Sequence, residues 1–329
     1  MRKGLLRFVL AASLTAAWPG LPSAQETAPA PAAEPLATQA AADGEFWEIP
    51  GIEVRGERWL EPDEILYSLR KLTAPDRGSR VLPRFYSPFC PRVAGVDRAT
   101  AAVLEERIRA NAKAAGLFTE PQNCRLNAFV IVLEEPLEMF DRLRNRRPGL
   151  FGNLLWNDRT IRSVRDDIKA GQPLVSWNQI GIGWPGIDSA TPEFSISAAP
   201  GFNFRGETAG RALYTPWVMK NIAVVVLDKN QLGGFNLDQI ADVSSLYLIG
   251  LPRRNLDFTG VTAPTMLRMF EAGPVNAPAE LTEFDRAYLR GILVQDRNTL
   301  SDRIGDRVVE VYREECALPD GQCDLEKGG

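Results

Sequence analysis

Histidine is absent from all 329 residues of the chain. Without an imidazole, the protein cannot use a Ser-His-Asp or Cys-His nucleophile or a His-Glu-x-x-His zinc site. The sequence also lacks the Gly-x-Ser-x-Gly and Walker motifs and the EF-hand calcium loop. Catalysis would therefore have to rely on carboxylates, Lys, Tyr, Ser or a metal held by oxygen atoms, and we expect no cofactor and no metal.

The chain also lacks an excess of positive charge, since its net charge is −4. Nucleic-acid-binding surfaces are normally basic, so we expect no nucleic-acid partner. Arginines do gather between residues 142 and 165, but Asp141, Asp158 and Asp166 are mixed among them. This mixture is typical of a solvated helix surface.

A long apolar run is missing everywhere except at the start of the chain. There, Arg2, Lys3 and Arg7 accompany the apolar stretch 5–18, and small residues lead to Ala24. This pattern predicts a signal peptide over 1–24, too short to serve as a membrane span. Residues 25–44 are almost wholly Ala, Pro, Thr, Gln and Glu, which predicts a disordered tether. We therefore expect a periplasmic or secreted protein without a membrane span after cleavage.

Only four cysteines are present, and none forms a Cys-x-x-Cys pair. In an exported protein this number suggests two disulfides. Cys316 and Cys323 enclose a short loop that suits a local bridge, and Cys90 and Cys124 would then bracket the helix between them. The two other pairings remain open at this stage.

The remaining residues, 45–329, favour one α+β domain that could divide near 171–175. Helices and strands alternate early, β-prone pieces with Gly and Pro cluster over 175–214, and helices dominate the end. This order predicts a mixed sheet with packed helices and a helical C-terminal part. Strands are predicted at 46–55, 127–133 and 222–227, and helices at 61–72, 97–116, 137–147, 156–170, 237–249, from Thr282, and before Cys316.

Three glycines, Gly181, Gly183 and Gly186, match Gly-x-Gly-x-x-Gly, but Pro185 interrupts the motif and no helix pattern follows it. A dinucleotide site needs that helix, so a glycine-rich loop is the better interpretation. Trp177 precedes this segment and Trp184 lies within it, and both are candidate ligand-binding residues that could line a sugar groove. Core packing is the favoured interpretation of both indoles.

The stretch 220–250 predicts a buried strand, a polar turn and a helix. Together with Leu-Thr-Glu-Phe-Asp-Arg-Ala-Tyr-Leu-Arg at 281–290, this order weakly resembles the later part of zincin-type metallopeptidases. In that family the helix carries His-Glu-x-x-His, which would fall here on Asp238, Gln239 and Asp242. The resemblance therefore implies a degenerate, zincin-like scaffold that has lost its metal-binding motif. More generally, the chain resembles a group of uncharacterised exported proteins from proteobacteria.

Local helix chemistry explains the same residues without a ligand. Asn236 is a good N-cap, and Gln239 stands at the reciprocal position of a capping box. Asp238 suits the first turn, and Asp242 reads as an ordinary residue of the polar face. We therefore expect a non-catalytic binding or interaction protein, with an unknown protein or small ligand of the cell envelope as partner. The alternative is a secreted hydrolase, a glycosidase or peptidase, that uses carboxylates near 177–184.

Overall fold

The computed structural model describes residues 57–73, 82–119, 124–151, 158–183, 196–197, 217–295, 303–316 and 323–324. The chain separates into two units after Glu53, and all described residues belong to the second, Val54–Gly329. The predicted signal peptide, the tether, the strand at 46–55 and Trp184 lie outside the described residues.

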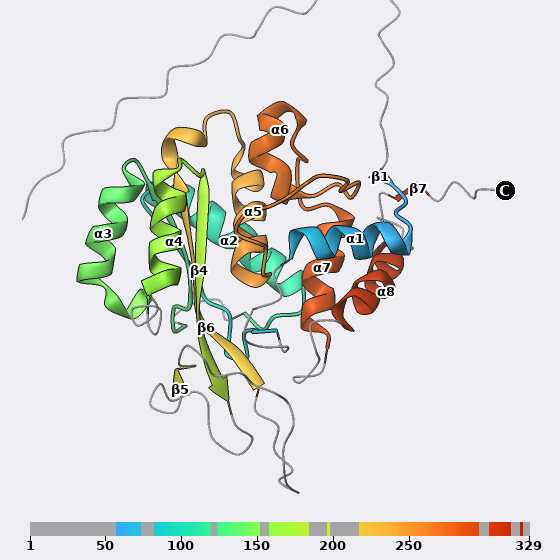
Figure 1. Cartoon of the computed structure of the whole chain (residues 1–329), viewed down its shortest axis with the longest axis horizontal. Helices are drawn as coiled ribbons and strands as arrows, with labels where there is room; N and C mark the ends of the chain where they lie inside the picture. The colour runs from blue at the N-terminus through green and yellow to red at the C-terminus, as the bar shows by residue number, and fades with distance from the viewer. Residues whose placement is uncertain are drawn as a thin grey trace, which may run out of the picture. The chain divides into compact units, whose positions relative to one another are not determined.

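A five-stranded mixed sheet lies at the centre of the second unit (Figure 1). Its strands are β2 Pro91–Ala94, β3 Ala128–Leu133, β4 Leu174–Gly183, β5 Ile196–Ser197 and β6 Trp217–Asp228, in the order β2-β3-β6-β4-β5. The first three in this order are parallel, and β4 runs antiparallel to both of its neighbours. A separate two-stranded piece pairs β1 Glu57–Arg58 with β7 Cys323–Asp324. The mixed sheet and its helices confirm the predicted α+β class.

Helices cover both faces of the sheet. They are α1 Pro62–Leu72, α2 Arg98–Ala114, α3 Pro136–Arg146, α4 Asp158–Lys169, α5 Leu237–Ile249, α6 Met269–Asn276, α7 Glu283–Leu293 and α8 Ile304–Cys316. The pair α3 and α4 lies on one face, α2 and α5 lie on the other, and α1, α7 and α8 pack beyond them (Figure 1). Among the described residues, no helix is both long and apolar enough to cross a membrane.

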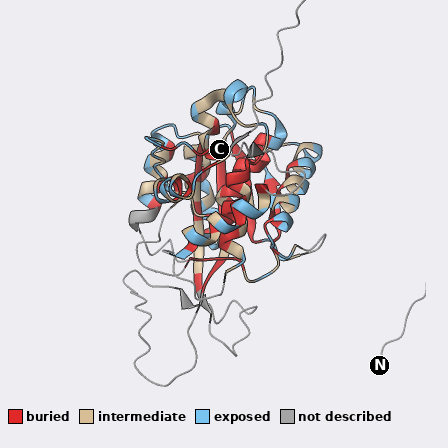
Figure 2. Ribbon diagram, turned by 90° about the vertical axis from the view of Figure 1, so that its right-hand side faces the viewer, coloured by how far each residue is buried: buried red, intermediate tan, exposed pale blue. Residues whose placement is uncertain are grey.

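The sheet divides two hydrophobic cores because side chains alternate between its faces. On β3, Val130 and Val132 pack with α2 and α5, whereas Ile131 and Leu133 join the core under α3 and α4. The buried residues accordingly concentrate in the central strands and in the helices against them (Figure 2).

Strand β2 was not predicted from the sequence, which reads as loop up to Pro91. It is a short edge strand, and a proline at its first position leaves the rest of its pairing with β3 intact. Gly95 follows directly, with φ of 91°, and a Cβ there would lie 1.9 Å from the carbonyl oxygen of Val132. Only glycine allows this close approach of the two chains.

Helix α5 is buried on nearly every side because it lies against strands, α2, α7 and the turn before α6. The interpretation of Asp242 as a residue of a polar face is therefore wrong, because Asp242 is completely buried, whereas Leu237 at the start of the helix is 37% exposed. A helix covered on all sides has no single apolar stripe, so the sequence pattern could not show which residues are buried.

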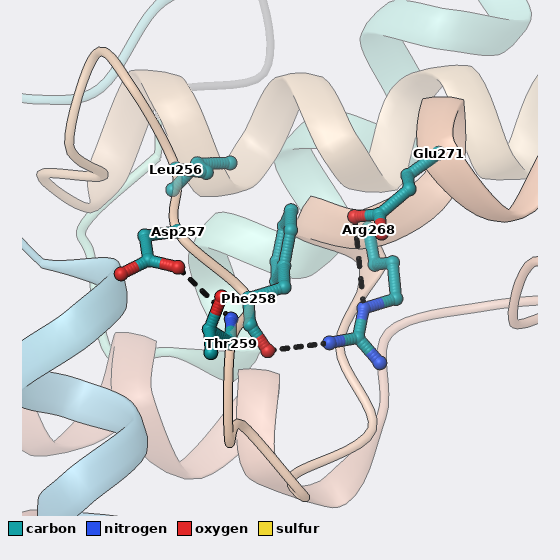
Figure 3. Close-up of a pocket in the computed structure, with 6 residues that line it drawn as sticks. All are labelled: Leu256, Asp257, Phe258, Thr259, Arg268 and Glu271. Carbon is teal, nitrogen blue, oxygen red and sulfur yellow. Dashed lines mark hydrogen bonds and ion pairs between the residues drawn. The ribbon is translucent and has the colours of Figure 1, made fainter.

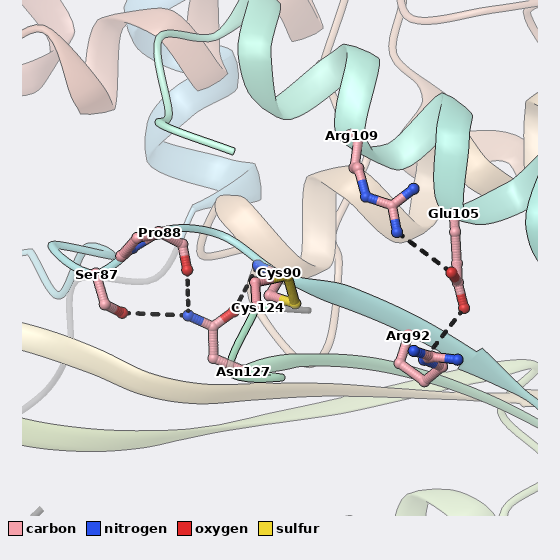
Figure 4. Close-up of a disulfide and its surroundings, with 8 residues drawn as sticks. All are labelled: Ser87, Pro88, Cys90, Arg92, Glu105, Arg109, Cys124 and Asn127. Atoms are coloured by element: carbon pink, nitrogen blue, oxygen red, sulfur yellow. Dashed lines mark hydrogen bonds and ion pairs between the residues drawn. A yellow bond between two sulfur atoms is a disulfide. The ribbon is translucent and has the colours of Figure 1, made fainter. Parts of the chain in front are cut away.

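A disulfide joins Cys90 and Cys124 (Figure 4). This is the pairing that the sequence favoured for these two cysteines. The side chain of Asn127 secures the same region by donating to Ser87 Oγ and to the Pro88 carbonyl, at 3.2 and 2.9 Å. It also accepts a 2.8 Å bond from the Cys90 N–H. Cys316 also takes part in a disulfide, and its predicted partner Cys323 has no described side chain.

Candidate ligand-binding site

The two acids at the peptidase-like positions of α5 do not share an open site. Asp238 is exposed in the first turn, where the helix dipole favours its charge. Gln239 closes the capping box: its Oε1 accepts from Asn236 N at 3.1 Å, and Asn236 Oδ1 accepts from its N–H at 2.7 Å. The local explanation of these residues is therefore confirmed for Asn236, Asp238 and Gln239.

Asp242 belongs to a buried ion pair that links α5 to α2. Its two carboxylate oxygens accept from Arg107 Nε and Nη2, both at 2.9 Å, and further bonds come from Asn111 and the Leu281 N–H. This pairing holds the pKa of Arg107 above its usual value. The prediction of an ordinary polar-face residue is wrong because α2 packs directly over this side of α5.

Trp177 lies inside the core beneath α3 and is only 4% exposed. Its ring stacks on Phe151, meets Phe140 edge-on, and donates its indole N–H to the Leu150 carbonyl at 3.0 Å. An indole enclosed in this way cannot line an open sugar groove.

The carboxyl ends of β3 and β6 form the place where open α/β sheets commonly bind ligands, since α3 and α5 leave them on opposite faces. Here that edge is closed by internal bonds. Lys229 pairs with Glu134 at 2.5 Å, and the Asn230 amide donates to the Glu134 carbonyl. Asp228 accepts from Asn230 and Gln231. The polar side chains at this edge therefore form hydrogen bonds and an ion pair with one another.

Two adjoining pockets lie instead around the loop after α5. The Arg70 pocket has a volume of about 390 Å³ and is lined by Tyr67, Arg70, Lys71, Arg253, Asn255 and Asp257. The Arg268 pocket has a volume of about 460 Å³ and is lined by Leu256, Asp257, Phe258, Thr259, Arg268 and Glu271. Because Asp257 lines both, the two pockets are neighbours, and we treat them together as one candidate site between α1 and the segment that leads into α6.

Asp257 is fixed by bonds on both sides. Its Oδ2 accepts from Lys71 at 2.5 Å, and its Oδ1 accepts from the Thr259 N–H at 3.0 Å. The bond from Lys71 lowers the pKa of Asp257 to about 2 and raises that of Lys71. Tyr67 steadies the same loop by donating to the Thr259 carbonyl at 3.3 Å. The wall between the two pockets is thus a pre-formed ion pair.

Arg268 is the one cation in the described lining of the second pocket (Figure 3). Its guanidinium lies 4.7 Å from the centre of the Phe258 ring and donates to the Phe258 carbonyl at 3.2 Å. Glu271 stands 3.9 Å from Arg268 Nε, which has no hydrogen-bond partner among the described residues. This pocket therefore presents one cation, the two carboxylates of Asp257 and Glu271, and an aromatic ring.

Sequence reasoning did not single out any residue of these pockets. The only local signal is that Ser68 and Lys71 have the Ser-x-x-Lys spacing of a nucleophile motif. Ser68 is completely buried in the core, whereas Lys71 pairs with Asp257, so the two side chains do not act as a nucleophile and its base. Among the described residues, no three His, Cys, Asp or Glu side chains are placed to hold a metal.

Comparison with known proteins adds no assignment. Neither a protein-family model nor a curated protein nor a solved structure matches this chain.

Proposed function

We propose that the protein is a non-catalytic binding protein of an oxidising compartment, the periplasm or the cell exterior, and that the Arg70 and Arg268 pockets hold its ligand. The observation that carries this proposal is the Lys71–Asp257 pair, which forms without a ligand and whose Asp257 lines both pockets. Pre-organised polar groups reduce the entropy lost on binding. The disulfide between Cys90 and Cys124 supports the compartment. Descent from a zincin-type peptidase stays a prediction.

The chemistry of the pocket carboxylates favours binding over hydrolysis. A glycosidase needs one carboxyl that is still protonated near its working pH. Lys71 holds the pKa of Asp257 at about 2, so this group stays ionised at neutral pH. The second acid, Glu271, forms an ion pair with Arg268, whose Nε lies 3.9 Å from its carboxylate.

The experiment compares binding with turnover on the same purified, disulfide-containing protein. Thermal melting is followed with glucose, N-acetylglucosamine, glycine, citrate and inorganic phosphate, while nitrophenyl glycosides and casein serve as substrates. We expect saturable stabilisation by at least one probe, loss of that effect in Asp257→Ala, and no turnover. Hydrolysis that disappears in Glu271→Gln would establish the hydrolase alternative instead, and stabilisation that persists in Asp257→Ala would place the binding site elsewhere.

A further inference from the structure

The lining of the Arg70 pocket is strongly positive. Arg70, Lys71 and Arg253 contribute three cations, and Asp257 contributes the one opposing charge among the lining residues. The whole chain carries a net charge of −4, so this local excess opposes the average field of the protein. Attraction of an anion here would therefore come from the pocket and not from the overall charge.

Arg253 is held rigidly by the end of α1. Its Nε donates to the Thr73 carbonyl at 2.7 Å, its Nη2 donates to the Arg70 carbonyl at 2.8 Å, and its main-chain N–H bonds to Leu72. A guanidinium has five N–H donors, and these bonds use only two of them. The remaining donors belong to a group whose position is already fixed, which limits the entropy lost when a ligand binds.

Arg70 adds a cation that has no bonded acid. It lies in the last turn of α1 and is exposed, and within the described ranges its guanidinium makes no hydrogen bond or ion pair. Lys71 beside it is bound to Asp257, which neutralises the carboxylate that would otherwise repel an anion. The amide of Asn255 supplies a neutral donor on the same lining.

We infer that the Arg70 pocket binds a small oxoanion, such as a phosphate, sulfate or carboxylate group, between the guanidinium groups of Arg70 and Arg253. This inference rests on the proposed function and names the ligand class of one of its two pockets. Planar guanidinium groups match the paired oxygens of such anions better than an ammonium does. Arg253 donates to the main-chain carbonyls of Arg70 and Thr73, so the capping of this helix end does not depend on the side chain of Arg70.

The test is calorimetric titration of inorganic phosphate into the full disulfide-containing protein at low ionic strength. Sulfate and acetate form two further arms that distinguish the oxoanions, and glucose is the neutral probe. We expect one oxoanion to bind at one site, with affinity about tenfold lower in Arg70→Ala, because a charged hydrogen bond is lost. Arg253→Lys keeps the positive charge but loses the paired N–H donors of the guanidinium, and it should weaken binding by a similar factor.

Arg144→Ala is the matched control, since Arg144 is exposed near the end of α3, away from the pocket. This variant should bind as the unchanged protein does. A lower melting temperature in Arg253→Lys would mean that this variant also disturbs the end of α1. The binding result for Arg70→Ala then tests the inference, because the side chain of Arg70 makes no hydrogen bond to the helix within the described residues. Oxoanion binding that Arg70→Ala leaves unchanged would overturn the inference. Saturable binding of glucose without binding of any oxoanion would also overturn the inference, but it would still agree with the proposed binding function.

Discussion

Arg84 and Lys220 lie side by side, and each caps the end of a different helix. The Lys220 N–H donates to the Arg84 carbonyl at 2.8 Å, which joins the two segments. Lys220 Nζ donates to the carbonyls of Leu248, Ile249 and Gly250 at the end of α5. Arg84 in turn donates to carbonyls at the end of α7. Two buried cations therefore replace the local caps that helix ends otherwise need.

Replacing Lys220 with methionine should destabilise the fold by about 2–4 kcal/mol. The ammonium is completely buried, and its loss leaves three carbonyl oxygens at the end of α5 without these donors. Burial lowers the pKa of Lys220 to about 7, so part of this loss is offset by the relief of desolvation. Urea unfolding measures the change.

Lys229→Met is the control for this substitution. Lys229 forms only a surface pair with Glu134, so its removal should change stability by less than about 1 kcal/mol. Equal losses in the two variants would contradict the capping role of Lys220.

Asp285 should make stability depend on pH between about 4 and 6. Burial raises its pKa from 3.8 to about 6, against bonds from Thr265, Met266 and Thr282. Below pH 4 the carboxyl is protonated in both the folded and unfolded states. Between 4 and 6 the folded state holds the proton more tightly, so unfolding releases it and rising pH weakens the fold. The loss should approach about 2–3 kcal/mol by pH 7.

Asp285→Asn tests this pH dependence, since the amide does not titrate. The asparagine variant loses acceptors and should be less stable at every pH, but its unfolding free energy should lack the fall between pH 4 and 6. Parallel curves for the two proteins, measured by urea unfolding across this range, would show that Asp285 does not carry the effect.

Removing the disulfide with Cys90→Ala and Cys124→Ala should lower stability by about 3–4 kcal/mol, because the bridge spans 34 residues of the unfolded chain. The β2–β3 pairing should survive, since Asn127 holds the same segment through three hydrogen bonds. Adding Asn127→Ala should then cause a second loss of about 2 kcal/mol. Denaturant unfolding measures both steps, and a double-alanine variant that is already unfolded would contradict the role given to Asn127.

Local signals in the sequence predicted local structure well. Asp97 caps α2 by accepting from the Ala99 and Thr100 N–H groups, and Gly116 follows the helix with φ of 100°. The helix predicted from Thr282 begins there, with a capping box between Thr282 and Asp285. Each of these outcomes depends on residues within four positions of one another, so the sequence pattern contains the whole interaction.

Long-range polar contacts could not be predicted in this way. Lys220 looks like a polar residue at the edge of an apolar run, and nothing nearby indicates that carbonyls about thirty residues later will surround it. The same holds for the candidate site, where Lys71 and Asp257 are separated by 186 residues. A single sequence gives no measure of which distant charges meet once the helices have packed.

The pair between Arg107 and Asp242 offers the sharpest test of how α2 and α5 are joined. Among the described residues, Arg107→Leu leaves the completely buried Asp242 carboxylate with bonds from Asn111 and the Leu281 N–H alone, and it should cost about 3 kcal/mol. Adding Asp242→Leu removes that stranded charge. The double variant should therefore be more stable than Arg107→Leu alone, although each substitution taken singly is destabilising.

A double-mutant cycle in urea measures this coupling, with Arg92→Ala as the control. Arg92 is 56% exposed and stands 3.6 Å from Glu105, so its loss should cost less than about 1 kcal/mol. If the double variant proves less stable than Arg107→Leu, the bonds that Asp242 accepts from Asn111 and Leu281 outweigh the pair itself. The carboxylate would then act chiefly to tie the start of α7 to α5, because Leu281 lies just before the Thr282 cap.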